Sequence, residues 1–98
     1  MLTSKQRSYL KSLASRLTAT MSIGKEGLTE SVVRQADNQL EARELIKISV
    51  QRGSEYNSRE LIAEVAERLS AEPVIAIGNN IVLYRRSSRD NVKHIELP

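Results

Sequence analysis

A short apolar run that enters a glycine-bounded turn and leaves it as a helix is the feature that most constrains the fold of this chain. Residues 18–23 alternate apolar and polar side chains, which predicts a short, edge-like strand. Gly24 and Gly27 bound the turn, and Thr29 is a good N-cap for a helix that begins at Glu30. A strand that passes through a tight turn directly into a helix is typical of folds that layer helices on a sheet.

The same turn is a candidate anion site. Glycine permits backbone conformations closed to residues with a Cβ and lets another backbone approach closely. The helix start places unpaired N–H groups and the positive end of the macrodipole beside Gly24 and Gly27. Lys25 adds a positive charge between them, whereas Glu26 puts a carboxylate where a phosphate would lie. Most turns with this glycine spacing are only structural, so features elsewhere in the chain must show whether this turn binds an anion.

Periodicity elsewhere predicts three helices and four strands. The predicted helices span residues 2–17, 30–43 and 57–69, and the predicted strands span residues 18–23, 45–51, 74–77 and 81–84. Thr3 to Gln6 fits a capping box, and Gly78 to Asn80 fits a hairpin turn. The order α-β-α-β-α-β-β predicts one α/β domain over residues 1–98, with a four-stranded mixed sheet packed with helices. The first two strands should be parallel neighbours in a βαβ unit.

Burial can also be predicted from these patterns. The side chains expected to form the buried stripe of the first helix are Tyr9, Leu10, Leu13 and Leu17. Residues 74–77 are apolar throughout, as in a strand covered on both faces. Residues 51–56 predict a loop, and the polar run from residue 87 predicts a loose tail whose end Ile95 and Leu97 could pin to the sheet.

Composition excludes several classes of protein. The 98 residues, 40% of them hydrophobic, suffice for one small core. The chain has no cysteine, which removes disulfides, cysteine-based zinc sites and thiol catalysis. It has no 18-residue apolar run and opens directly into an amphipathic pattern, so we expect neither a membrane span nor a signal peptide. We therefore expect a cytoplasmic protein.

Charge is distributed unevenly along the chain, although the net charge is only +3. Residues 1–29 hold five bases and one acid, residues 30–72 hold six bases and nine acids, and residues 73–98 hold four bases and two acids. The two ends are therefore basic and the middle is acidic. If the ends meet in the fold, they form a positive surface that can neutralise phosphates.

An enzyme is the weakest interpretation. His94 is the only histidine, and an isolated histidine in a polar tail is expected to be exposed. No serine has an evident base to activate it. Glu60, Glu64 and Glu67 lie opposite the apolar stripe of their helix, which predicts a solvated face. We expect no catalytic residue, no metal site and no cofactor.

Four blocks of sequence, in the right order, resemble the YhbY family, the bacterial stand-alone versions of the CRM (chloroplast RNA splicing and ribosome maturation) domain. The blocks are Lys5-Gln6-Arg7, Ile23-Gly24-Lys25-Glu26-Gly27-Leu28-Thr29, Glu44-Leu45-Ile46-Lys47, and Ile77-Gly78 with Leu83-Tyr84-Arg85. The resemblance implies a fold similar to the C-terminal domain of translation initiation factor three. It also implies RNA binding and association with precursors of the large ribosomal subunit, with rRNA as the partner.

The family's loop is compared with the Gly-x-x-Gly loop of KH domains, which clamps the backbone of single-stranded nucleic acid. By resemblance it maps onto Gly24, Lys25, Glu26 and Gly27, although a KH loop joins two helices and a strand is expected before this one. The further RNA contacts expected from resemblance and charge are Lys5, Arg7, Lys11, Lys47, Arg85 and Arg86. Because the chain has three tyrosines and neither phenylalanine nor tryptophan, we expect recognition of backbone and shape, with low sequence specificity.

A second function remains open from the sequence. The acidic second and third helices could dock a basic partner, such as a ribosomal protein, with the glycine turn purely structural. Treatment with RNase distinguishes the RNA-binding hypothesis from the protein-binding hypothesis, since a contact with a protein partner survives digestion. Binding to DNA shares the charge argument, and only the resemblance favours RNA. We expect a monomer with no membrane partner.

Overall fold

The elements of the computed structural model, which describes residues 2–51 and 58–98, follow one another in the predicted order. The helices are α1 (Ser4–Ala14), α2 (Glu30–Arg43) and α3 (Ser58–Leu69), and the strands are β1 (Met21–Ile23), β2 (Leu45–Val50), β3 (Glu72–Ile77) and β4 (Asn80–Tyr84). The predicted fold class is therefore confirmed. Beyond Gln51, the predicted loop and Asn57, the first residue of the predicted third helix, lie outside the described residues.

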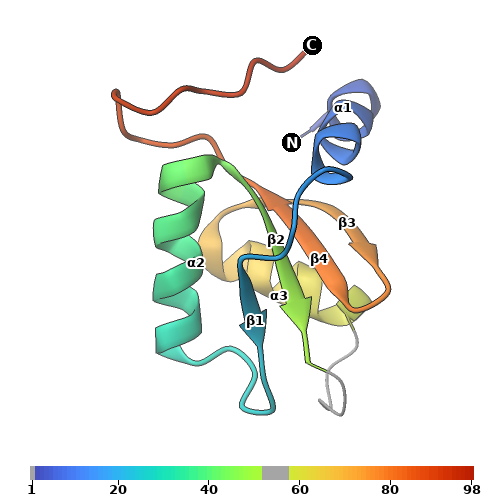
Figure 1. Ribbon diagram of the computed structural model, residues 1–98, viewed down its shortest axis with the longest axis vertical. Coiled ribbons are helices and arrows are strands. Elements are labelled where there is room, and N and C mark those ends of the chain that lie inside the picture. Colours follow the sequence, from blue (N-terminus) through green and yellow to red (C-terminus); the bar gives the residue numbers. More distant parts are fainter. Residues whose placement is uncertain (1, 52–57) are drawn as a thin grey trace.

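The four strands form one mixed sheet in the order β1-β2-β4-β3 (Figure 1). β1 and β2 are parallel, with Met21 opposite Ile48, so the βαβ unit is confirmed. β4 runs antiparallel to β3, which confirms the predicted hairpin, and it also runs antiparallel to β2. Gly78 takes a φ of +55° in the hairpin turn, a conformation that side chains with a Cβ rarely adopt. In the strand order β1-β2-β4-β3, the edges of the sheet are β1 and β3.

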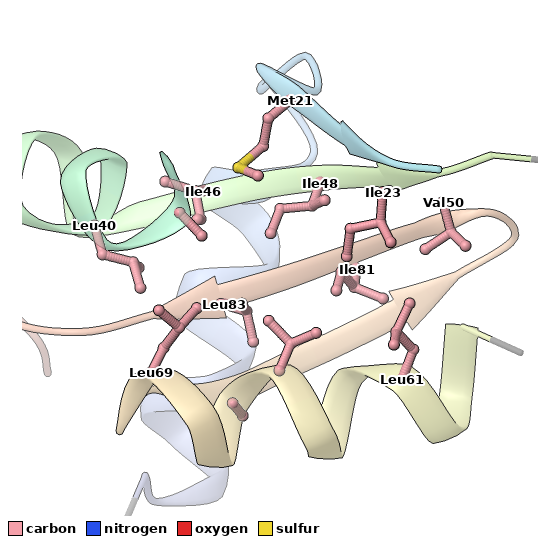
Figure 2. Packing of buried hydrophobic residues seen from close by; sticks show 13 residues of the cluster. Met21, Ile23, Leu40, Ile46, Ile48, Val50, Leu61, Leu69, Ile81 and Leu83 are labelled. Atoms are coloured by element: carbon pink, nitrogen blue, oxygen red, sulfur yellow. The ribbon is translucent and has the colours of Figure 1, made fainter. Parts of the chain in front are cut away.

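The first of two hydrophobic clusters lies between the sheet and the helices α2 and α3. Because side chains alternate along a strand, β2 sends Ile46, Ile48 and Val50 to this side. Figure 2 shows these side chains meeting Leu40 of α2 and Leu61 of α3. The cluster consists of Met21, Ile23, Ala36, Leu40, Ile46, Ile48, Val50, Leu61, Val65, Ala66, Leu69, Ile81 and Leu83.

The second cluster lies on the opposite face of the sheet, under α1. Its buried members are Leu2, Leu10, Ala14, Leu45, Val74, Val82 and Tyr84. Ile95 and Leu97, near the end of the chain, pack against it, as the sequence suggested. The first and last segments of the chain therefore share one end of the molecule (Figure 1).

The first helix is shorter than predicted, and one residue of its predicted stripe is not in the core. The capping box is present, because the Thr3 hydroxyl accepts from the Gln6 N–H and the Gln6 side chain accepts from the Thr3 N–H. The prediction that Tyr9 is buried is wrong, since 39% of this residue is exposed. Leu10 and Ala14, one turn apart, face the sheet, and Tyr9 is rotated about 100° from Leu10 around the helix.

The prediction that residues 74–77 form a strand covered on both faces is also wrong. Ile77 is 60% exposed, and Ile75 and Ala76 are only partly buried. The physical reason is position, because β3 is an edge strand and α1 covers only part of this face. Pro73 lies inside β3, where an edge tolerates its missing N–H.

Candidate nucleic-acid interface

The turn from β1 to α2 has the geometry that the glycines predicted. Gly27 takes a φ of +70°, and its N–H donates to the Gly24 carbonyl over 3.0 Å. A Cβ on Gly24 would lie 3.0 Å from Gln51 Oε1, so the end of the Gln51 side chain lies close to this glycine. The positive φ of Gly27 is therefore the feature of this turn that favours glycine.

The turn opens onto a shallow cavity at the start of α2. The Thr29 hydroxyl accepts from the Val32 N–H over 3.2 Å, which confirms the N-cap. The cavity has a volume of about 310 Å³ and is lined by the four turn residues together with Thr29, Val32 and Gln51. Helix N-termini of this kind favour anions. Lys25 and Glu26 are both exposed, so their opposite charges leave the rim of the cavity close to neutral.

The basic residues predicted on the first helix do not join the glycine turn. Lys5, Arg7 and Lys11 all lie on α1, which contains no acidic residue. Figure 1 places α1 at one end of the long axis and the turn after β1 at the other. The basic ends of the chain do meet, at the α1 end, but the positive surface is separate from the predicted anion site.

Lys47 on β2 is partly buried and has an intramolecular partner. Its Nζ donates to the Leu17 carbonyl over 3.0 Å, and Thr20 N–H donates to the Lys47 carbonyl over 3.2 Å. Lys47 therefore ties the segment between α1 and β1 to the sheet. Its ammonium is therefore already engaged by a partner within the protein.

Arg85 and Arg86, predicted as a pair, have different surroundings. The Arg85 guanidinium donates to the carbonyls of Leu69 and Asp37 and forms an ion pair with the Asp37 carboxylate over 2.8 Å. It also lies 3.6 Å from Glu41. Arg85 thus links the C-terminal halves of α2 and α3. Arg86 is exposed on the other side of the sheet, beside α1.

A buried carboxylate that the sequence did not single out as functional anchors the C-terminal tail. Glu44, at the C-cap of α2, is fully buried and has a φ of +68°. Its carboxylate accepts from the N–H groups of Ser87 and Ile95, each over 2.6 Å. His94 Nδ1 lies 2.6 Å from the same carboxylate, so the expectation of an exposed histidine is wrong.

The electrostatics of Glu44 follow from these contacts. Burial raises the pKa of its carboxyl, but the hydrogen bonds from His94, Ile95 and Ser87 outweigh that effect and hold the pKa below its usual value. The group is therefore a charged hydrogen-bond acceptor in the folded protein. Ile95 is 51 positions away in the sequence, so no local pattern could have identified this role.

Three further observations concern metal ligands, the acidic face of α3 and membrane-spanning helices. No group of three or more histidine, cysteine or acidic residues in ranges 2–51 and 58–98 could hold a metal ion. Glu60, Glu64 and Glu67 are exposed along α3, which confirms the prediction of a solvated face. No helix in the described part of the chain is long and apolar enough to span a bilayer.

Comparison with known proteins adds independent information. The family model described as the CRS1/YhbY (CRM) domain matches residues 2–85. The match therefore includes α1, the glycine turn and the whole sheet, and it stops at Arg85, before the tail.

Individual relatives cover more of the chain. A Bacillus subtilis protein named "Probable RNA-binding protein YqeI" is 40% identical over 98 residues, the full length of both chains. An RNA-binding protein of Haemophilus influenzae is 34% identical over 92 residues, which is 94% of this chain and 93% of that one. The solution structure of a hypothetical protein from Staphylococcus aureus matches all of both chains with a TM-score of 0.83 and 43% identity.

Proposed function

Because the chain belongs to the CRS1/YhbY (CRM) domain family, we propose that it is an RNA-binding protein that holds the RNA backbone at the turn between β1 and α2. The observation that carries the proposal is this turn, in which Gly27 has a positive φ and the start of α2 faces an open cavity. Backbone N–H groups at a helix start can bind phosphate without reading sequence.

The set of RNA contacts expected from the sequence becomes smaller in our proposal, because some of these side chains have partners within the protein. Gly24, Lys25, Glu26 and Gly27 remain the proposed loop contact, in which the Glu26 carboxylate repels the phosphate and weakens binding. The α1 bases and Arg86 remain candidate phosphate contacts, whereas the intramolecular partners of Lys47 and Arg85 remove them from the proposal. Affinity should fall steeply with salt, since phosphate contacts release counterions.

The biological target in this proposal is the rRNA of large-subunit precursors, and the role is in ribosome assembly in the cytoplasm. The support for this target is the resemblance in four sequence blocks. Sedimentation of the tagged protein from lysate at low salt tests it, with RNase-treated and high-salt controls. Co-migration with large-subunit precursors that high salt abolishes is the expected result. Protein found only at the top of the gradient would contradict the ribosomal role.

A matched pair of substitutions tests the loop itself. Gly27→Asp and Gly27→Asn have nearly the same shape, and both side chains tolerate a positive φ, so they differ chiefly in charge. We expect Gly27→Asp to bind an unstructured RNA at least tenfold more weakly than Gly27→Asn, because the carboxylate lies at the anion site. Fluorescence anisotropy at several salt concentrations measures this, and thermal unfolding verifies that both variants fold. Equal binding by both variants would show that the loop is only a structural turn and does not contact RNA.

The alternative is a protein-interaction module that uses α2 and α3. Each of these helices carries three acidic and two basic residues, so their exposed side is slightly acidic. A basic partner that co-purifies after complete RNase digestion would favour it.

A further inference from the structure

A second feature at the far end of the molecule from the glycine turn has no assigned role. An open groove of about 1240 Å³ runs between α1 and the C-terminal tail, over the end of β4. It is larger than most small-molecule pockets and much larger than the cavity at the glycine turn. Tyr9 and Leu13 line it from α1, and Lys93 and Leu97 line it from the tail.

The tail wall of this groove is held by specific contacts. Glu44 fixes the segment at Ser87, His94 and Ile95, through the three contacts described above. Near the chain end, Gln6 Nε2 donates to the Pro98 carbonyl over 3.3 Å, and Leu97 packs on the second hydrophobic cluster, under α1. The groove therefore has two walls that the fold positions, one from each end of the chain.

The groove offers the chemistry that binds a nucleotide. Tyr9 is the exposed aromatic side chain among the described residues, and it lies in this groove. Arg86 and Lys93 line the same groove and are exposed, and Glu96 is the exposed acid among its lining residues. An aromatic face stacks on any base, and nearby cations neutralise its phosphates. The adjoining α1 adds three bases and no acid.

We propose that this groove is a second RNA-binding site, in which a single-stranded nucleotide stacks on Tyr9 and its phosphates contact Arg86 and Lys93. The inference rests on the proposed function, and it adds a base contact to the backbone contact at the glycine turn. The CRM match ends at Arg85, so the tail wall lies outside the region that the family model describes.

The positions of the two sites predict a dependence on RNA length. They lie at opposite ends of a molecule whose longest extent is 37 Å. At about 3.4 Å per stacked nucleotide, one strand needs roughly ten nucleotides to reach both sites. Engagement of the second site by the same strand raises affinity through effective concentration.

The experiment compares unstructured RNAs of five and sixteen nucleotides by fluorescence anisotropy. The groove variant combines Tyr9→Leu, Arg86→Gln and Lys93→Gln, and the control variant combines Arg34→Gln and Arg68→Gln, which remove two charges from the exposed sides of α2 and α3. We expect the affinity of the groove variant for the longer RNA to be at least about fivefold lower than that of the wild type, because stacking on one aromatic side chain is lost. The control variant should lose less, and the advantage of the longer RNA should shrink only in the groove variant.

Photo-crosslinking gives a direct second measurement. With 5-iodouridine in the longer RNA, we expect a crosslinked peptide that contains Tyr9. Wild-type binding with no loss in the groove variant and no crosslink at Tyr9 would overturn the groove while leaving the glycine turn as the proposed site. No RNA binding by the wild type would overturn the proposed function and this inference together. A protein partner lost by the groove variant, with RNA binding intact, would assign the groove to that partner instead.

Discussion

The glycine turn and the α1–tail groove, our two proposed RNA sites, differ in how they are built and in the groups that they present at the two ends of the molecule. The turn is built from neighbouring residues 24–29, presents backbone groups at a helix start, and carries one base and one acid. The groove is built from α1 and from a tail up to 92 positions away, and its lining includes an exposed tyrosine and two exposed cations. A preformed turn needs little from the rest of the fold, whereas the groove depends on contacts that hold its walls.

The largest expected effect comes from removing the contact that holds the tail. Glu44→Ala leaves the N–H groups of Ser87 and Ile95 without their acceptor, so we expect a loss of about 2–4 kcal/mol in the free energy of unfolding. Urea denaturation measures this loss. Below the transition, the variant should lose the extra affinity for sixteen-nucleotide RNA and keep its affinity for short RNA. Unchanged binding of the longer RNA would show that the groove does not need its tail wall.

Acid pH should lower the free energy of unfolding by less than Glu44→Ala does, because a protonated Glu44 side chain still fills its site. The pKa of Glu44 is lowered in the folded protein. Its carboxylate therefore stabilises the fold above its usual pKa of 4.5, and this contribution disappears as the pH falls below 4.5 through the folded-state value. Urea denaturation between pH 7 and pH 3 should show this decrease in the wild type. Glu44→Gln should show a flatter profile, and identical profiles would contradict the assignment.

The neighbouring arginines sharpen the comparison because one stabilises the fold and the other faces the groove. Arg85→Ala removes the links to Leu69 and Asp37, and we expect a loss of about 1–2 kcal/mol in the free energy of unfolding with RNA affinity unchanged. Arg86→Ala should leave stability unchanged and reduce the salt slope of RNA binding by about one unit. The two variants are each other's control, and a reversal of these results would move the RNA surface to the side of α2 and α3.

The smallest expected effects come from the two charged side chains of the glycine turn, Lys25 and Glu26, whose charges oppose each other. Glu26→Gln removes a carboxylate about 5 Å from a bound phosphate, which is worth about 0.8 kcal/mol in water, or roughly fourfold in affinity. Lys25→Gln should weaken binding and lower the salt slope by about one unit. Short RNA at low salt gives the clearest measurement. If both substitutions leave affinity and slope unchanged, RNA does not contact this turn.

Much of the fold could be predicted because its signals are local. The order of elements, the start of α2 at Thr29 and the hairpin at Gly78 depend on spacing and caps within a few residues. The glycine turn was predicted for the same reason. The exposure of Tyr9 and Ile77 could not be predicted, since it depends on how far α1 extends over a sheet whose edge is β3.

The sequence by itself determined the strand–turn–helix unit, the alternating faces of β2 and the basic character of both chain ends, because each follows from residues close together in the chain. Only the tertiary structure decided that the basic ends meet at the far end from the glycine turn and that Arg85 is paired while Arg86 is exposed. It also decided that Glu44 holds the tail. The physical reason is the same in each case: the partners are distant in sequence, and packing on opposite faces of one sheet sets which of them meet.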